Sequence, residues 1–247
     1  MIELKAHQIA EATGGRLTSS VDVTTTVTSA DTDSRQLVPN SLYIARRGEV
    51  TDGHNFITAA RAAGAQLILA ERETTDQHGG VDPAVIVDDS TVAMGDLAHY
   101  IVEKIREHSE TTVIGVTGSV GKTSTKDALA TLLSSQGPTV APRGSYNGET
   151  GLPLTIFTAD LETRFLVVEM GADRLGNISE LTNIVRPDIS VVLTVGTAHA
   201  QSFGSLENIA ITKGEIVEAL EPNGIAVLNA DDIKVAEMAT RVPSGAK

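Results

Sequence analysis

The segment from Thr117 to Ser124 reads Thr-Gly-Ser-Val-Gly-Lys-Thr-Ser, which is the pattern of a phosphate-binding loop. Its glycines let the backbone wrap around anionic oxygens, its lysine can reach the β- and γ-phosphates, and the threonine after it can ligate Mg²⁺. Val116 stands where the strict G-x-x-x-x-G-K-S/T pattern has its first glycine, but the part that contacts phosphate is intact. The segment therefore predicts binding of a nucleoside triphosphate. The residues expected to contact it are Thr117, Gly118, Ser119, Gly121, Lys122, Thr123 and Ser124.

Two polar residues come at the ends of two further predicted strands, where open parallel sheets bind their ligands. Glu169 is the last residue of the predicted strand 165–169, so its carboxylate should project toward the phosphate loop. His199 follows the predicted strand 189–195 at the same edge. A solvated carboxylate is the ordinary alternative for Glu169. Because Mg²⁺ prefers oxygen ligands, a plain loop histidine is the alternative for His199.

A single lysine, Lys213, interrupts the apolar stripe of the predicted helix 205–220. At a periodicity of 3.6 residues this stripe consists of Leu206, Ile209, Ala210, Lys213, Ile216, Val217 and Leu220. Burial would lower the pKa of the amine, and a neutral amine can react with CO₂ to give a carbamate, an anionic metal ligand. A lysine that extends its charged end to solvent fits the same spacing. The spacing leaves both interpretations open.

The elements that must position these residues alternate between strands and helices. Helices are predicted at 122–135 and 205–220. Apolar strands are predicted before, between and after them, at 112–116, 165–169, 189–195 and 225–228. Continuous apolar strands separated by helices predict a parallel sheet covered on both faces. We therefore expect a doubly wound, mostly parallel α/β domain over 89–247 that is incomplete at its C-terminus.

The N-terminal part, 1–88, has a second α/β pattern. An alanine-rich helix is predicted at 56–63, and a helix at 5–13 should end at Gly14, since glycine easily adopts a left-handed cap. Short apolar runs of strand length occur at 42–45, 67–70 and 85–87. These features predict a small α/β domain that precedes the phosphate-binding domain.

Composition excludes several classes of function. The 247 residues include 19 basic and 32 acidic side chains, and the net charge of −13 argues against broad binding to nucleic acid. The absence of cysteine excludes disulfides, zinc–cysteine sites and iron–sulfur clusters. No apolar run has the length of a signal core or of a membrane span, so we expect a cytoplasmic protein without membrane insertion.

Taken together, the motifs resemble those of the Mur ligases, the ATP-dependent amide ligases of peptidoglycan precursor synthesis. The resemblance runs from about Ser29 to Asp232. In the first domain it is carried by Asp31-Thr-Asp-Ser-Arg35 and Asp52-Gly-His-Asn-Phe56. In the second domain its blocks are 117–126, 147–153, 168–172, 186–188, 199–205, 213–216 and 229–232.

The resemblance implies a role for each of the residues at the phosphate-binding edge. Lys122 would hold the γ-phosphate of ATP, and Thr123 and Glu169 would ligate one Mg²⁺. His199 and a carbamate on Lys213 would serve a second metal. These assignments come from the family's motifs and not from spacing.

Substrates and reaction are implied in the same way. Asn147 would position substrate and phosphate, and Ser34 and Arg35 would contact the uridine diphosphate of the substrate. Glu-Met-Gly-Ala at 169–172 and Lys-Gly-Glu-Ile at 213–216 favour the member that joins D-alanyl-D-alanine to UDP-N-acetylmuramoyl-tripeptide (UDP-MurNAc-tripeptide) through an acyl phosphate.

The chain departs from the family's pattern in length and at single positions. Family members carry a third domain, for which the residues after Asp232 are too few, so we expect a chain that binds the uridine nucleotide but does not turn over alone. The resemblance also implies a monomer. Gly148 stands where the family often has asparagine, Asn177 where it has glutamate, and Ala200-Gln201 where it has Leu-Glu. These departures concern fine positioning in the site.

Three other functions remain open at this stage. One is the sibling ligase that adds the third amino acid of the peptide. The others are a nucleotide-responsive switch and a module that only binds uridine nucleotides. A switch has no evident need for a strand-end glutamate or a buried lysine. The third residue of the tripeptide, lysine or a diamino acid, is not readable from the sequence.

Overall fold

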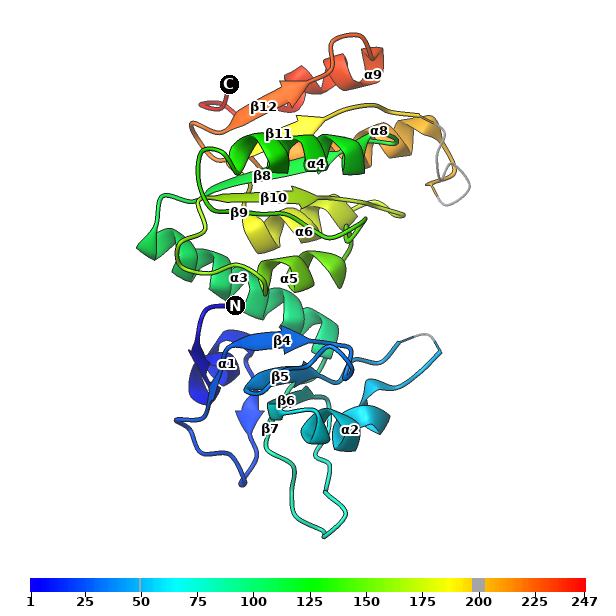
Figure 1. Cartoon of the computed structure of the whole chain (residues 1–247). Helices are drawn as coiled ribbons and strands as arrows, with labels where there is room; N and C mark the ends of the chain where they lie inside the picture. The colour runs from blue at the N-terminus through cyan, green and yellow to red at the C-terminus, as the bar shows by residue number, and fades with distance from the viewer. Residues whose placement is uncertain (49, 197–202) are drawn as a thin grey trace. The chain divides into compact units, whose positions relative to one another are not determined.

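The computed structural model describes residues 1–48, 50–196 and 203–247. The chain divides into two compact units, Met1–Ile101 and Val102–Lys247, each with its own five-stranded sheet (Figure 1). The α/β class predicted for both parts is confirmed. The division falls within helix α3 (Ser90–His108), which begins two residues after the predicted boundary at 88.

Unit 1 has a sheet of order β2-β7-β6-β5-β4, parallel except for β2, and a separate antiparallel pair of β1 and β3. Its elements are β1 (Leu4–Lys5), α1 (Ala6–Thr13), β2 (Arg16–Leu17), β3 (Thr26–Val27), β4 (Ser29–Asp31), β5 (Ser41–Ile44), a 3-10 helix (Gly53–Phe56), α2 (Ile57–Ala62), β6 (Ala65–Ala70) and β7 (Ala84–Ile86). Helix α1 ends at Gly14, whose φ of 62° is the predicted left-handed cap.

Unit 2 has a fully parallel sheet of order β12-β11-β8-β10-β9, with β8 in the middle. Its elements are β8 (Thr112–Thr117), α4 (Lys122–Leu133), β9 (Thr139–Val140), α5 (Gly151–Ile156), β10 (Phe165–Glu169), α6 (Asn177–Val185), β11 (Ile189–Val192), α8 (Leu206–Glu218), β12 (Ile225–Leu228), α9 (Ile233–Ala236) and a 3-10 helix (Glu237–Arg241). None of the helices described in the chain is long and apolar enough to cross a membrane.

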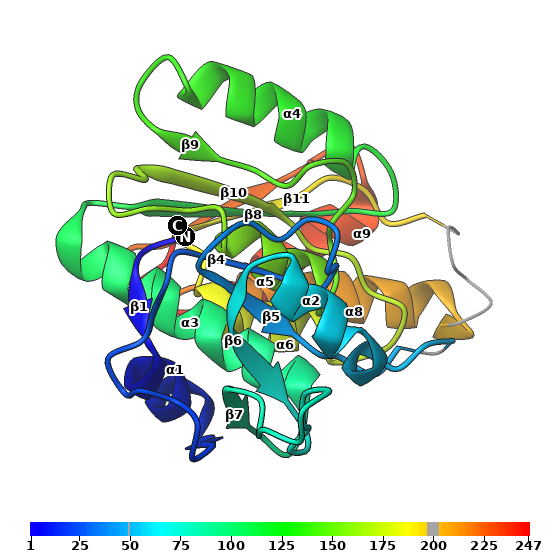
Figure 2. The same ribbon diagram turned by 60° about the horizontal axis from the view of Figure 1, so that its bottom comes forward.

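Helices cover both faces of the sheet of unit 2. Figure 2 shows α4 on one face and α6 and α8 on the other. On the α4 face, Ile114 and Val116 of β8 form a buried cluster with Val167 of β10. Leu129 and Leu133 of α4 pack against this cluster. Apolar side chains on both faces explain why the strands read as continuous apolar runs.

The carboxyl edge of this sheet brings the predicted functional residues together. Glu169, the last residue of β10, pairs in register with Val116, so it lies beside the start of the phosphate loop. Strand β11 ends at Val192 rather than at residue 195 as predicted. Leu193 N still donates to Thr117 O, at the end of β8 (3.0 Å), but Thr194 bonds to the phosphate loop: Ser119 N donates to Thr194 O (2.9 Å) and Val120 N donates to Thr194 Oγ1 (3.2 Å).

Candidate active site

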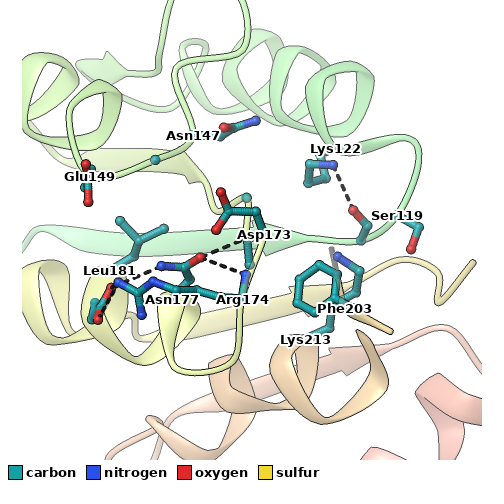
Figure 3. A pocket seen from close by; sticks show the side chains of 15 residues that line it. Ser119, Lys122, Asn147, Glu149, Asp173, Arg174, Asn177, Leu181, Phe203 and Lys213 are labelled. Carbon is teal, nitrogen blue, oxygen red and sulfur yellow. Dashed lines mark hydrogen bonds and ion pairs between the residues drawn. The ribbon is translucent and has the colours of Figure 1, made fainter. Parts of the chain in front are cut away.

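A cavity of about 630 Å³ lies at this edge of unit 2 (Figure 3). The phosphate loop lines one side of it, and residues 171–174 and the first turns of α6 line the other. Helix α8 contributes Lys213, and the segment before α5 contributes Asn147. The cavity therefore gathers side chains from four separate parts of the sequence.

The phosphate loop has the backbone shape that its glycines allow. Gly118 has a φ of 155° and Gly121 a φ of 86°, and a Cβ on Gly118 would lie 2.9 Å from the Cβ of Leu193. Helix α4 begins immediately afterwards at Lys122, so its unpaired N–H groups are available to an anion. The Lys122 amine donates to Gly118 O at 2.8 Å, which keeps it folded over the loop.

Glu169 is a buried carboxylate that accepts hydrogen bonds from two neutral side chains. Its side chain is 1% exposed; Thr123 Oγ1 donates to Oε2 at 2.8 Å and Asn147 Nδ2 donates to Oε1 at 2.8 Å. Within the described part of the chain it forms no ion pair, so its charge is not balanced by a basic side chain. A cation therefore fits here. One carboxylate and one hydroxyl suit Mg²⁺, which keeps several waters and adds phosphate oxygens.

Lys213 is the buried amine of α8. The residue is 6% exposed, and Figure 3 shows its amine on the cavity side of the helix. Burial lowers the pKa of this amine to about 8, and repulsion from Lys122 acts in the same direction. The structure thus excludes the solvent-extended alternative. The other predicted metal-site residue, His199, lies outside the described residues, and the described ones contain no cluster of three His, Cys, Asp or Glu side chains suited to a metal.

Helix α8 is fixed on a second side by Glu215, two residues after Lys213. The Glu215 carboxylate accepts from Gly176 N (2.8 Å), Ser179 N (2.9 Å) and Ser179 Oγ (3.2 Å), and so caps the N-terminus of α6. Gly176, the N-cap residue of α6, has no side chain with which to do this. Glu215 therefore ties the helix that carries Lys213 to the opposite wall of the cavity.

Gly214 leaves room for an arginine against the same helix. Arg241 donates to Ala210 O (3.2 Å) and Ile211 O (2.9 Å) and pairs with Glu218 (2.8 Å). A Cβ on Gly214 would overlap the guanidinium group. The arginine therefore lies against α8 only because residue 214 is a glycine.

We expect Glu215→Ala to lower the free energy of unfolding by about 2 kcal/mol, because two backbone N–H groups at the start of α6 lose their acceptor. Chemical denaturation followed by circular dichroism would measure this. Glu218→Ala on the same helix is the matched control, since its half-exposed ion pair with Arg241 contributes only about 0–1 kcal/mol. Equal losses in the two variants would contradict the capping role.

The outer half of the cavity contains charged residues that sequence reasoning did not predict. Arg174 pairs with both oxygens of Glu180 at 2.8 and 2.9 Å, and Asp173 and Glu149 also line the wall. Asn177, one of the departures from the family pattern, accepts from the backbone N–H groups of residues 173 and 174 at 3.1 Å. No periodic pattern marks these residues, because Glu149, Asp173 and Arg174 lie outside the helices and strands, and Asn177 and Glu180 lie in the first turn of α6.

Another departure, Gly148, opens the cavity. A Cβ at this position would meet no atom within 4 Å. A larger residue here would therefore extend into free space beside Asn147 and Glu149.

In unit 1 the two predicted uridine-contacting residues share a turn after β4. The Arg35 backbone and side chain hydrogen bond to the Asp33 carboxylate, which lowers the pKa of Asp33 to about 2. Arg35 itself is exposed and Ser34 half-buried, so both are accessible to a ligand.

The second motif of unit 1 has an internal structural role. The buried His54 contacts Asp52 through Nδ1 (2.6 Å) and accepts from Glu71 N through Nε2 (3.0 Å). Since Nε2 accepts, the ring proton is on Nδ1. This histidine joins the turn after β5 to the end of β6.

Comparison with protein-family models gives two matches along the chain. The model described as Mur ligase middle domain matches residues 116–245, and the one described as Mur ligase family, catalytic domain, matches residues 26–102. The chain belongs to the Mur ligase family. Among curated members, the UDP-N-acetylmuramoyl-tripeptide–D-alanyl-D-alanine ligase of Mycobacterium tuberculosis is 41% identical over 268 residues. That alignment covers 97% of this chain and 50% of the relative, so the chain spans about half the length of the curated Mur ligases it matches.

Solved Mur ligase structures agree with the fold. MurF from Acinetobacter baumannii superposes with a TM-score of 0.88 at 32% identity, covering 97% of this chain and 51% of that one. MurF from Thermotoga maritima, solved in complex with ADP, gives a TM-score of 0.75 at 34% identity over 89% of this chain and 49% of that one. The expected family and fold are therefore confirmed.

Proposed function

We propose that this chain supplies the uridine-nucleotide-binding and ATP-binding domains of a ligase that joins D-alanyl-D-alanine to UDP-MurNAc-tripeptide in the cytoplasm. The observation that carries this proposal is that Lys122, Asn147 and Lys213 line one cavity, with the buried Glu169 hydrogen bonded to Asn147 behind its wall. The Mycobacterium tuberculosis relative, which is named for these two substrates, supports the choice among Mur ligases. We further propose that the protein is a monomer.

The reaction needs two anions to meet. A carboxylate oxygen of the tripeptide attacks the γ-phosphorus of ATP, the bond from that phosphorus to the β-phosphate oxygen breaks, and ADP leaves. The amine of D-alanyl-D-alanine then attacks the carbonyl carbon of the acyl phosphate. Inorganic phosphate leaves and the amine proton is released. The protein contributes mainly charge neutralisation and positioning to the first step.

Lys122 and the N-terminus of α4 provide the positive charge for that step. The Lys122 amine, now on Gly118 O, would turn to the γ-phosphate when ATP binds. Thr123 and Glu169 would hold Mg²⁺, which neutralises charge on the phosphates when bound. Asn147, anchored on Glu169, would hold the attacking carboxylate and the phosphate in line.

Lys213 has a separate role in the proposal. Its lowered pKa leaves part of the amine neutral near neutral pH, and only the neutral amine reacts with CO₂. The resulting carbamate, together with His199, would serve a second metal ion. The desolvation that disfavours the ammonium therefore favours this modification.

Ligand-dependent thermal unfolding of the chain tests the proposal. UDP-MurNAc-tripeptide should raise the melting temperature by binding unit 1 through Ser34 and Arg35, and ATP should raise it only with Mg²⁺. A ligand at 100 times its Kd stabilises the folded state by about 2.7 kcal/mol. Binding is the appropriate readout because the curated relatives are about twice as long as this chain.

Two variants act as reciprocal controls for this measurement. A double variant, Ser34→Ala with Arg35→Ala, should lose only the uridine-nucleotide shift, and Lys122→Ala only the Mg·ATP shift. An ATP shift without a uridine-nucleotide shift would favour a nucleotide switch. A uridine-nucleotide shift alone would favour a binding module, and no shift with either ligand would overturn the proposal.

A further inference from the structure

Lys126 is a buried cation outside the cavity. Its side chain is 2% exposed, it lies on α4 three residues after Thr123, and it is absent from the described residues that line the cavity. The amine donates to Pro142 O at 2.7 Å and to Gly144 O at 3.2 Å. It also pairs with Asp127 at 2.6 Å, a carboxylate that is 65% exposed.

The two carbonyls that accept from Lys126 belong to the segment 141–150, which contains neither helix nor strand. This segment carries Asn147 into the cavity. Asn147 is itself attached to the end of β10, since its Nδ2 donates to Glu169 Oε1 (2.8 Å) and its O accepts from Gly171 N (2.7 Å). The segment is thus held by α4 near its start and by the end of β10 at Asn147, and its last residues accept hydrogen bonds from α5.

The burial of this ammonium needs a reason other than stability. Removing a charged amine from water costs free energy, and an apolar side chain of similar volume often serves a protein interior as well or better. The charge-assisted bonds to two carbonyls offset that cost and give the segment a fixed position that its own backbone does not provide. Thr123 and Lys126 lie on the same side of α4, so one helix fixes the positions of Glu169 and of the segment that carries Asn147.

We propose that Lys126 is a positioning residue, whose ammonium fixes the segment 141–150 so that Asn147 meets Glu169 beside the phosphate loop. It touches neither phosphate nor substrate and acts through Asn147. The inference rests on the proposed function, because it assigns Asn147 to the binding of Mg·ATP. It extends the nucleotide site to a second layer of residues that are not accessible to the ligand.

The first test is the affinity for Mg·ATP, measured by isothermal titration calorimetry on Lys126→Met, Asn147→Ala and the double variant. Each single variant should bind about tenfold more weakly, the effect of losing charge-assisted hydrogen bonds. If Lys126 acts through Asn147, the double variant should bind no more weakly than Asn147→Ala alone. Asp127→Asn, which removes the exposed ion pair but keeps both carbonyl bonds, is the matched control and should bind like the wild type.

Two results of this titration would overturn the proposal. One is a double variant whose loss of affinity for Mg·ATP equals the product of the two single losses. The other is an unchanged affinity in Lys126→Met. A general loss of folded protein would reduce the number of binding sites per chain and leave the affinity of the remainder unchanged. A purely structural role is thereby distinguished from positioning.

Hydrogen–deuterium exchange provides a second test that needs no nucleotide. In Lys126→Met, exchange over 141–150 should rise at least tenfold while β8 and β10 stay protected. Unchanged exchange over this segment would overturn the anchoring role even if the wild type bound no ATP, so this inference and the proposed function fail separately. If Lys126→Met does not fold, Lys126→Gln, which retains one neutral donor, takes its place with the same expected direction and the same contradicting result.

Discussion

Replacing Lys122 by alanine in a complete enzyme that contains this chain is expected to reduce acyl phosphate formation by on the order of 10²–10³, because a preorganised cation at the transferring phosphoryl group is lost. The reason lies in the geometry of the loop, since Lys122 follows Gly121 directly and its amine already lies over the loop at Gly118 O. ADP release in the presence of UDP-MurNAc-tripeptide, measured in the complete enzyme, would follow the first step of the proposed ligase reaction. The affinity of this chain for Mg·ATP would measure binding.

Lys104→Ala is the matched control for this prediction. Lys104 is a partly exposed lysine of the same unit that pairs with Glu107 and is not among the residues that line the cavity. It should leave both measurements unchanged. ADP release at the wild-type rate by Lys122→Ala would contradict the role given to this lysine.

Glu169→Gln should weaken the binding of Mn²⁺, used as a probe for Mg²⁺, by about 100-fold in the presence of ATP. Substitution of a residue that only supports a metal ligand lowers metal affinity by about 10–100-fold, and this substitution removes the proposed ligand itself. The substitution preserves size and packing but removes the charge of a carboxylate that hydrogen bonds to Thr123 and Asn147. Electron paramagnetic resonance of free Mn²⁺ would give the affinity directly.

The cavity contains its own control for this experiment. Glu180 lines the cavity, but it is half-exposed and its charge is paired with Arg174. Glu180→Gln should therefore change Mn²⁺ binding by less than about threefold. Similar losses in the two variants would mean that general negative charge in the cavity, and not Glu169 itself, holds the metal.

Sequence reasoning succeeded where a residue type had a single plausible location. The phosphate loop had to follow a strand, and Glu169 had to lie at the end of the next parallel strand beside it. Helix α8 was predicted within two residues at either end, and the burial of its stripe is confirmed except at Leu206, which is 40% exposed. Lys213 could be assigned to the stripe but not to the interior, because spacing does not determine how deep a face is buried.

The features that the sequence did not predict depend mainly on contacts between segments that are distant in the sequence. Glu215 reads as an ordinary solvent-facing glutamate, yet it is 8% exposed because α6 covers a second side of α8. Lys126 looks like one more basic residue after the phosphate loop, and only the path of 141–150 explains its burial. The strands β1 to β4 have two or three residues each, too few for a periodic signal.

The close fit of Arg241 against Gly214 restricts the order in which these two positions can change during evolution. A side chain gained at 214 while the arginine is present would push the guanidinium away from the carbonyls of Ala210 and Ile211. Loss of the arginine first removes that obstacle and leaves 214 free to vary. We therefore expect position 241 to change before position 214 during neutral evolution. A lineage that kept the arginine would also have kept the glycine next to Lys213.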